Sequence, residues 1–134
     1  MIAADTSALV AIVLGEAERM VFRNAIREAR TVFVSTVSVI ELKMVVYGRR
    51  GPRGVVQAES LLKLRKFEIT PPSVADMEAA FAAFVAFGKR SGHPAALNFG
   101  DLFSYALAKV RSLPLLFKGN DFAQTDIEVV VISN

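Results

Sequence analysis

Four carboxylates in this chain lie beside or within apolar segments, where they could bind a metal ion or act in acid–base catalysis. Asp5 ends the first short apolar run, MIAAD, and Glu41 lies among apolar residues in VSVIELKMVV. Asp101 follows a glycine in NFGDLF, and Asp121 follows another apolar run in LLFKGND. A carboxylate among apolar residues is costly to bury unless it is paired, so these positions need an explanation.

Each of the four also has a purely structural explanation. Three have the position or spacing of helix-capping residues. The pairs are Asp5 with the helix starting near Ser7, Glu41 with Ser38, and Asp101 with Asn98. Asp121 instead follows a Gly-Asn turn sequence. Taken singly these explanations suffice, so a functional interpretation depends on where folding brings the side chains.

Short apolar runs alternate with longer helical segments, which is typical of an α/β domain with a largely parallel sheet. The expected strands are Ile2–Ala4, Val32–Ser35, Phe67–Thr70, Leu115–Phe117 and Val129–Ile132. The expected helices are Ser7–Gly15, Glu16–Arg30, Val37–Tyr47, Pro52–Lys66, Val74–Phe87 and Asp101–Val110. The sequence has no repeat or linker, so we expect one domain over residues 1–134.

The expected topology brings the carboxylates together. In an open α/β sheet, ligand sites form beyond the carboxyl ends of the strands, where Asp5 and Asp121 follow their strands directly. Asp101 begins the helix before the fourth strand, and Glu41 lies about one turn into the helix after the second. Crowded carboxylates repel one another, and a divalent cation removes that repulsion. Because the chain has no cysteine and a single histidine, oxygen-ligand preferences select Mg²⁺ or Mn²⁺.

This site predicts phosphodiester chemistry. Mg²⁺ keeps several waters and shares its shell with phosphate oxygens, so the expected substrate carries phosphate. Metal ions held by the four carboxylates would lower the pKa of a bound water and orient it for in-line attack. No nucleophilic side chain is needed. Thr6 and Ser7 are candidates to hydrogen-bond a metal-bound water, although helix capping also accounts for them.

Composition limits the class of protein. The 134 residues are 53% hydrophobic, yet no apolar run reaches the ~18–20 residues of a membrane span. The first residues lack the basic start of a signal peptide, so we expect a cytoplasmic protein without a membrane partner. The absence of cysteine excludes disulfides and thiolate catalysis. The excess of apolar residues predicts a surface covered by a partner.

Three further features have simple interpretations. His93 is expected in a loop, SGHP. Phe81, Phe84 and Phe87 have helical spacing and are expected to pack in the core. The stretch GRRGPRG (Gly48 to Gly54) is expected to be a flexible turn, with phosphate contact by its three arginines as the alternative. The net charge of +3 is compatible with an anionic partner.

Four motifs occur in a characteristic order along the chain. They are ADTSAL, SVIEL, NFGDLFSYALA and GNDFAQTDI. As an ordered set they resemble the PIN-domain ribonucleases, and more closely the VapC toxins of bacterial type II toxin–antitoxin pairs. The resemblance spans essentially the whole chain, whereas any one motif alone would be weak.

The resemblance implies a three-layer α/β/α fold with a mostly parallel sheet of about four or five strands. It implies Mg²⁺- or Mn²⁺-dependent endonuclease activity on structured RNA such as tRNA or ribosomal RNA. It also implies a homodimer, inhibited by a VapB-like antitoxin in a larger hetero-oligomer. The family's metal-binding and catalytic acids fall on Asp5, Glu41, Asp101 and Asp121. The family often has a further acid where Asn120 stands, so Asp126 remains an alternative to Asp121.

Two other α/β classes lack their required residues. A receiver domain needs a phosphoacceptor aspartate after the third strand, where EITPPS has none. A haloacid-dehalogenase-like phosphatase needs a second aspartate two residues after Asp5, where Ser7 stands. The remaining alternative is a PIN-like scaffold without catalysis, acting as an RNA-binding or antitoxin-binding module.

Overall fold

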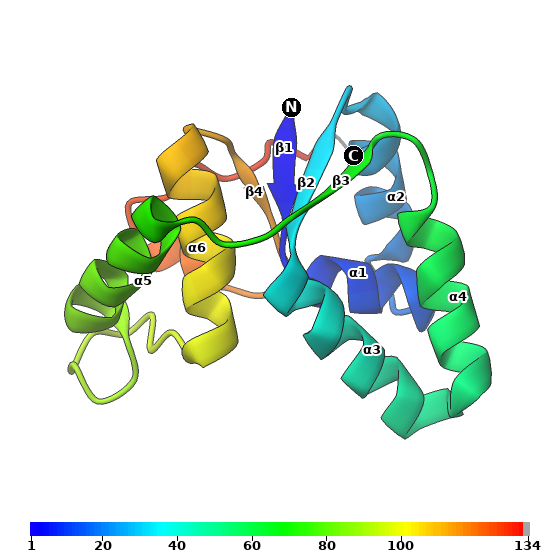
Figure 1. Ribbon diagram of the computed structural model, residues 1–134, viewed down its shortest axis with the longest axis horizontal. Coiled ribbons are helices and arrows are strands. Elements are labelled where there is room, and N and C mark those ends of the chain that lie inside the picture. The colour runs from blue at the N-terminus through cyan, green and yellow to red at the C-terminus, as the bar shows by residue number, and fades with distance from the viewer. Residues whose placement is uncertain (133–134) are drawn as a thin grey trace.

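The computed structural model describes residues 1–132, which contain a four-stranded parallel sheet. The strands are β1 (Ile2–Ala4), β2 (Val32–Ser35), β3 (Phe67–Thr70) and β4 (Leu115–Leu116). They lie in the order β3-β2-β1-β4 (Figure 1). Because every neighbouring pair is parallel, the carboxyl ends of all four strands lie at the same edge of the sheet.

Helices cover both faces of this sheet, which confirms the predicted three-layer α/β/α fold. They are α1 (Thr6–Val13), α2 (Arg19–Glu28), α3 (Thr36–Arg50), α4 (Pro52–Leu62), α5 (Val74–Phe87), α6 (Phe99–Arg111) and the 3₁₀ helix η1 (Phe122–Gln124). In Figure 1, α5 and α6 lie on one side of the strands and α1 to α4 on the other. Within residues 1–132, no helix combines the length and apolar character needed to span a membrane.

The central strand β1 separates two apolar cores. Its side chains alternate between faces, as in any strand. Ile2 and Ala4 belong to the core that contains Phe22 of α2, while Ala3 belongs to the core that contains Leu107 of α6. The strand is therefore fixed from both sides, and so is the point at which the chain leaves it.

The arginine-rich stretch is helical on both sides of one break, so the prediction of a flexible turn was wrong. Helix α3 continues through Gly48 to Arg50, and α4 starts at Pro52. Only Gly51 interrupts them, with φ +64°, a conformation that favours glycine. The guanidinium of Arg50 is already engaged. It donates to the carbonyls of Val13 and Leu14 and to the side chain of Gln57.

The phenylalanine stripe of α5 is mostly on the surface, so the prediction that it packs in the core was wrong. Phe81 is 68% exposed and Phe84 45% exposed. Helix α5 buries its small residues Ala80 and Ala83 instead. Only Phe87 is partly buried, with its ring against His93, which lies in a loop as predicted. An apolar face of α5 is thus left open.

The fifth expected strand, Val129–Ile132, is reduced to a single bridge between Val129 and Leu115. Two backbone hydrogen bonds hold this segment beside β4. Leu115 N–H donates to the carbonyl of Glu128 at 2.8 Å, and Val130 N–H donates to the carbonyl of Leu115 at 3.1 Å. Residues 128–130 thus lie beside β4 without forming a regular fifth strand.

A partly buried ion pair joins the first turn of α5 to the last turn of α6. The two guanidinium nitrogens of Arg111 lie 2.8 and 3.2 Å from the two oxygens of Asp76. Asp76 also completes a capping box with Ser73. Burial acts to raise the pKa of Asp76, but the hydrogen bonds from Arg111 and Ser73 outweigh burial and lower it.

We expect Asp76→Asn to lower the free energy of unfolding at pH 7 by about 2–3 kcal/mol, because it leaves a largely buried guanidinium without its counter-charge. Since the folded-state pKa of Asp76 is lowered, the wild-type advantage is present at neutral pH and lost as the pH falls through that pKa. Urea unfolding at pH 7 and pH 3 measures this. Glu78→Gln on the same helix is the control, and an equal loss at both pH values would contradict the expectation.

Candidate active site

Asp5 is the residue at which the chain leaves β1, and it is 4% exposed. Its Oδ2 accepts the backbone N–H of Ser7 at 3.0 Å, so Asp5 caps α1 as the structural explanation predicted. Its Oδ1 accepts the hydroxyl of Ser104 at 2.6 Å. Both carboxylate oxygens are therefore held by neutral donors rather than by a cation.

Glu41 reaches the same edge of the sheet from the second turn of α3. Its Oε1 lies 3.2 Å from the hydroxyl of Thr6, which also lies 3.2 Å from the carbonyl oxygen of Ser38. The capping interpretation of Glu41 was wrong, because the cap of α3 is Ser35 and Ser38 lies inside the helix. Glu41 therefore takes no part in capping α3, and its carboxylate lies beside Thr6 of α1.

The first turn of α6 completes this arrangement. A β-carbon on Gly100 would overlap the carboxylate of Glu41, so a larger residue there would push that carboxylate out of its present position. Asp101 forms the predicted capping box with Asn98, with two N–H···O hydrogen bonds of 2.9 Å. Only Oδ2 of Asp101 is used in that box. Among residues 1–132, no group donates a hydrogen bond to its Oδ1.

The charges of these residues are coupled. Burial, together with the charges of Asp5, Asp121 and Glu41, raises the pKa of Asp101 to about 6 against the opposing hydrogen bond from Asn98. Burial and the charge of Asp5 also raise the pKa of Glu41, with the Thr6 hydroxyl acting in the opposite direction. The negative charges of Asp5, Glu41 and Asp121 thus act on Asp101, and none of these four acids is part of an ion pair among residues 1–132.

Asp121 and Asp126 differ in what surrounds them. Asp121 lies in the exposed loop before η1, makes no capping hydrogen bond, and acts on the pKa of Asp101. Asp126 is paired with Lys109 at 2.8 Å and accepts the hydroxyl of Tyr105. Burial acts to raise the pKa of Asp126, but Lys109 and Tyr105 outweigh it and lower the pKa. Of the two, Asp121 is the residue that belongs with the cluster.

The hydroxyls of Thr6 and Ser7 both make contacts within the protein. Thr6 donates within the cluster, as described above. Ser7 Oγ accepts the backbone N–H of Lys118 at 2.9 Å. The ammonium of Lys118 in turn pairs with Glu16 and Glu18. These contacts fasten the loop that carries Asp121 to the start of α1.

The donor set of this cluster suits a hydrated magnesium-like ion. It contains oxygen ligands only, which hard cations prefer. Within residues 1–132, no three acidic side chains form a ready-made shell around one ion. Mg²⁺ needs less than that, because it is typically held through one or two carboxylates together with water and substrate phosphate. The free oxygen of Asp101 and the mutual repulsion of the acids both favour a cation here.

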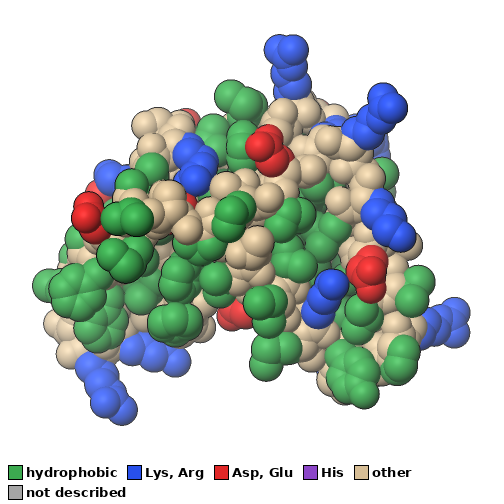
Figure 2. Space-filling model, viewed as in Figure 1, with side chains coloured by type: hydrophobic (Ala, Val, Ile, Leu, Met, Phe, Trp, Pro, Cys, Tyr) green, Lys and Arg blue, Asp and Glu red, His purple; other side chains and the backbone are tan. Residues whose placement is uncertain are grey.

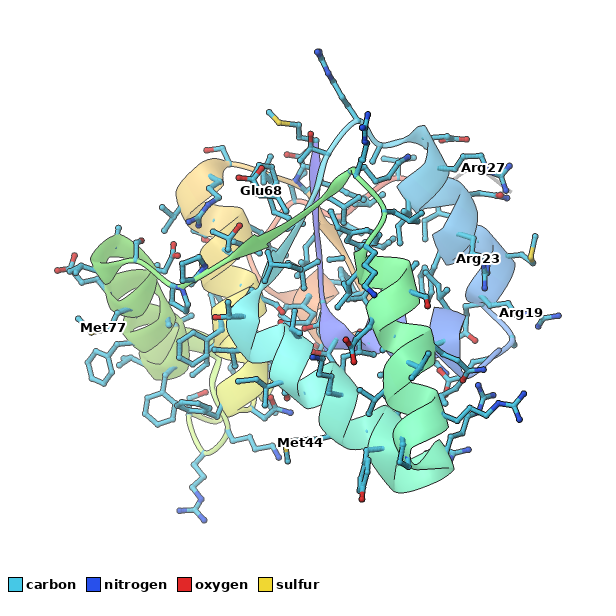
Figure 3. All side chains as sticks on the ribbon, turned by 45° about the vertical axis from the view of Figure 1, so that its right-hand side comes forward. Arg19, Arg23, Arg27, Met44, Glu68 and Met77 are labelled. Carbon is cyan, nitrogen blue, oxygen red and sulfur yellow. The ribbon has the colours of Figure 1, made fainter. Side chains whose placement is uncertain are left out.

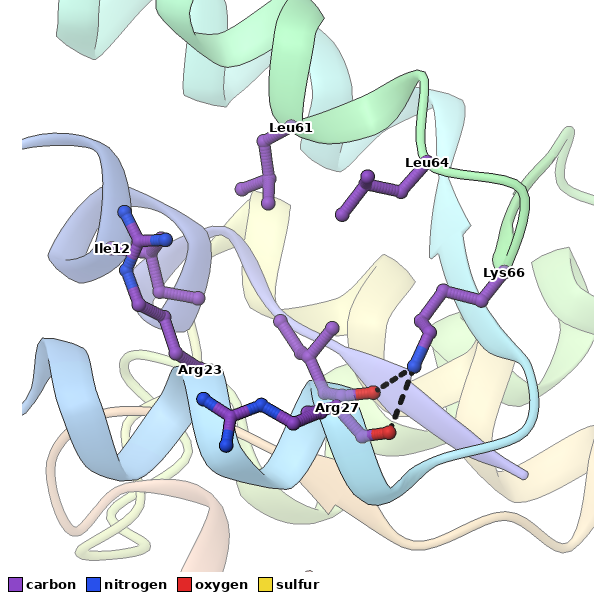
Figure 4. Close-up of a pocket in the computed structure, with 7 residues that line it drawn as sticks. Ile12, Arg23, Arg27, Leu61, Leu64 and Lys66 are labelled. Carbon is purple, nitrogen blue, oxygen red and sulfur yellow. Dashed lines mark hydrogen bonds between the residues drawn. The ribbon is translucent and has the colours of Figure 1, made fainter.

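Away from the acidic cluster, a hollow of about 280 Å³ lies between α2 and α4 (Figure 4). None of the four carboxylates lines it. It is lined by Ile12, Arg23, Ile26, Arg27, Leu61, Leu64 and Lys66. Lys66 is occupied there, since its ammonium donates to the carbonyls of Ile26, Arg27 and Ala29 and so caps α2. Figure 3 shows Arg19, Arg23 and Arg27 following one another along α2. The hollow thus has an apolar floor and a basic rim.

Fold and site together define an α/β/α protein whose acidic residues gather where parallel strands end. Residues 2–128 match the PIN domain, and the chain belongs to that family. It is 39% identical over 124 residues to the VapC ribonuclease Mb0625 of Mycobacterium bovis, covering 92% of this chain and 93% of that one. It is 38% identical over 128 residues to ribonuclease VapC30 of Mycobacterium tuberculosis, covering 96% and 97%.

Solved structures have the same fold. The VapC20 toxin of Mycobacterium tuberculosis, described as cleaving the sarcin-ricin loop, superposes with a TM-score of 0.80 at 20% identity, over 97% of this chain and 98% of that one. VapBC2 of Rickettsia felis, bound to a DNA fragment from its promoter, gives 0.79 at 14% identity, over 99% and 100%. The resemblance to PIN-domain ribonucleases and VapC toxins seen in the sequence is confirmed.

Sequence reasoning missed the hydroxyl that contacts Asp5. Ser104 is fully buried and separated from Asp5 by 99 positions in the chain. The signal for it was weak: one serine in the mostly apolar stretch LFSYALA, three residues after Asp101. A lone serine in a helix is compatible with many structural positions, so the contact could only be found in the folded chain.

We expect Asp101→Asn to raise the free energy of unfolding of the metal-free protein at pH 8 by about 1 kcal/mol, after allowing for solvent screening. Asparagine keeps the oxygen that accepts the Asn98 N–H, and it removes a negative charge that is repelled by the other acids. Because the folded-state pKa of Asp101 is raised, the wild-type penalty is present above about pH 6 and fades as the pH falls toward the unfolded value. The advantage of the variant should therefore shrink at pH 4.5.

Urea unfolding in the presence of EDTA at the two pH values measures this difference. Asp126→Asn is the matched control: it removes an ion-paired carboxylate, so it should destabilise the protein at pH 8. An Asp101→Asn protein less stable than wild type at pH 8 would show that the acids are not crowded enough to oppose folding.

Proposed function

We propose that this protein is a cytoplasmic, divalent-metal-dependent endoribonuclease of the VapC type, restrained by a partner antitoxin. The observation that carries the proposal is the coupled cluster of Asp5, Glu41, Asp101 and Asp121 at the carboxyl edge of the sheet. Its relatives named VapC ribonuclease support the same activity. The substrate class is structured RNA such as tRNA or ribosomal RNA, in keeping with the described target of VapC20.

Asp5, Glu41, Asp101 and Asp121 would hold Mg²⁺ or Mn²⁺, which when bound supplies an activated water and stabilises developing charge at phosphorus. The chain's own contribution is to hold these acids in place. Ser7 and Ser104 fix both oxygens of Asp5, and Thr6 orients Glu41. The N-terminus of α6 favours an anionic phosphate near Asp101 through its dipole.

The hollow between α2 and α4 is the surface that we propose for the VapB-like antitoxin. An apolar floor beside Arg23 and Arg27 suits an amphipathic segment with acidic residues on one side. Among the solved structures with a similar fold are toxin–antitoxin complexes, which support a partner of this kind. The same hollow also accounts for part of the apolar excess of the sequence.

The open apolar face of α5 and α6 is the surface that we propose for a second copy of the chain. We call it the phenylalanine face, formed by Met77, Phe81, Phe84, Phe99 and Phe103 around a hollow of about 370 Å³. Phe99 is 73% exposed. Figure 2 shows apolar side chains gathered over α5, with lysines and arginines at the periphery. Exposed patches of this kind mark interaction surfaces.

For the activity, we expect purified chain to cleave RNA at discrete sites with Mg²⁺ and to stop when EDTA is added. Asp5→Asn and Asp101→Asn should each lower the cleavage rate by about a hundredfold or more while keeping the fold, because each removes a charged ligand. Gel analysis of labelled tRNA and ribosomal RNA fragments measures the rate, and circular dichroism checks folding.

Asp126→Asn is the control for this experiment, since Asp126 is paired with Lys109. Its cleavage rate should match that of wild type, whereas Asp121→Asn should lower the rate. Cleavage that survives EDTA would refute a metal-dependent enzyme. RNA binding with no cleavage under any metal would leave the non-catalytic binding module as the function.

For the assembly, we expect wild type to be a dimer and Phe81→Glu with Phe84→Glu to be a monomer, because charge on an exposed apolar face disrupts docking and not the fold. Light scattering after size exclusion measures the mass. A chain concentration of about 50 μM is high enough to populate a dimer of ordinary interface affinity. Met20→Glu, an exposed apolar position on α2, should remain dimeric. A monomeric wild type would contradict the proposed dimer.

A further inference from the structure

A chain of buried hydroxyls lies behind Asp5. Ser104 and Ser38 are both fully buried. The hydroxyl of Ser104 donates to Oδ1 of Asp5 at 2.6 Å, and Oγ of Ser38 lies 3.1 Å from Oγ of Ser104. Because Ser104 has one hydroxyl proton and gives it to Asp5, Ser38 must donate in the second bond. The direction of donation is therefore from Ser38 to Ser104 to Asp5.

This chain connects two of the acids through a single residue. The side chain of Ser38 leads through Ser104 to Asp5. The hydroxyl of Thr6 lies 3.2 Å from both the backbone carbonyl of Ser38 and Oε1 of Glu41, so its single proton is shared between these two acceptors. The participating residues come from the end of β1, the start of α1, and the interiors of α3 and α6. Their positions relative to one another are thus set by contacts between distant parts of the chain.

Apart from pairing the buried carboxylate of Asp5, folding gives no reason for these hydroxyls. A hydroxyl at a fully buried position is unfavourable unless it is paired, and alanine is a better helix former than serine. Replacing both partners of a buried hydrogen bond by apolar groups is often close to neutral. Ala108, one turn after Ser104, shows that a small apolar residue suits this face of α6. What alanine cannot do is donate to Asp5.

We infer that Ser104, supported by Ser38, is a positioning residue that holds the carboxylate of Asp5 ready for a divalent cation. The inference rests on the proposed metal-dependent function. With Oδ2 held by Ser7 and Oδ1 by Ser104, the carboxylate is held at both oxygens, and each oxygen keeps a further acceptor site. Groups that orient a metal ligand in this way contribute strongly to metal affinity.

Mn²⁺ binding to the RNA-free chain, followed by electron paramagnetic resonance, tests this inference without relying on activity. We expect Ser104→Ala to bind Mn²⁺ about ten- to a hundredfold more weakly than wild type. Ser38→Ala should bind a few-fold more weakly, since it acts through Ser104. The double variant should then bind no more weakly than Ser104→Ala. Cleavage by Ser104→Ala should be recovered at raised Mg²⁺.

Ser73→Ala is the matched control, because it removes the serine cap of α5. It should lower stability and leave Mn²⁺ affinity unchanged. A folded Ser104→Ala protein with wild-type Mn²⁺ affinity overturns the inference, while the proposed function stands if wild type binds Mn²⁺ and cleaves RNA. A wild type that binds no Mn²⁺ overturns both. If Ser104→Ala does not fold, the Mn²⁺ affinity of Ser38→Ala tests the inference instead. A Ser38→Ala protein that binds Mn²⁺ as tightly as wild type then overturns it.

Discussion

Repulsion between acids that the fold brings together is the physical constraint on which the site depends. Among residues 1–132, the ion pairs link Lys109 to Asp126, Arg111 to Asp76, and Lys118 to Glu16 and Glu18. None of them includes an acid of the cluster. Asp5, Glu41 and Asp101 are held by hydroxyls and backbone N–H groups, which fix a carboxylate without cancelling its charge. The resulting crowding is unfavourable for the empty protein and favourable for binding a cation.

Helix capping and site chemistry are not competing explanations here. Asp5 and Asp101 both cap helices, and both belong to the acidic cluster. A helix N-terminus offers unpaired N–H groups and a positive dipole end, so it is a place where a carboxylate is tolerated near others. The cap fixes one oxygen, and at Asp101 the second oxygen remains available. The two functions use different atoms of the same side chain.

The alternation of strands and helices predicted much of this arrangement, because parallel strands place the residues that follow them at one edge. Ile2–Ala4, Val32–Ser35 and Phe67–Thr70 were predicted with their observed bounds. Helical spacing could not show that α5 buries alanines and leaves Phe81 exposed, since a periodic pattern does not specify which face another element covers. The contact of Ser104 with Asp5 depends on packing between distant segments, which local sequence does not encode.

Gly100 determines where the carboxylate of Glu41 can lie. The space that Glu41 occupies exists because one residue of α6 has no side chain. Adding a single carbon there would leave every acid chemically intact and still displace the carboxylate of Glu41 from its present position. The integrity of the site therefore depends on an absent atom as much as on charged ones, and a comparison of chains by their acidic residues alone would overlook it.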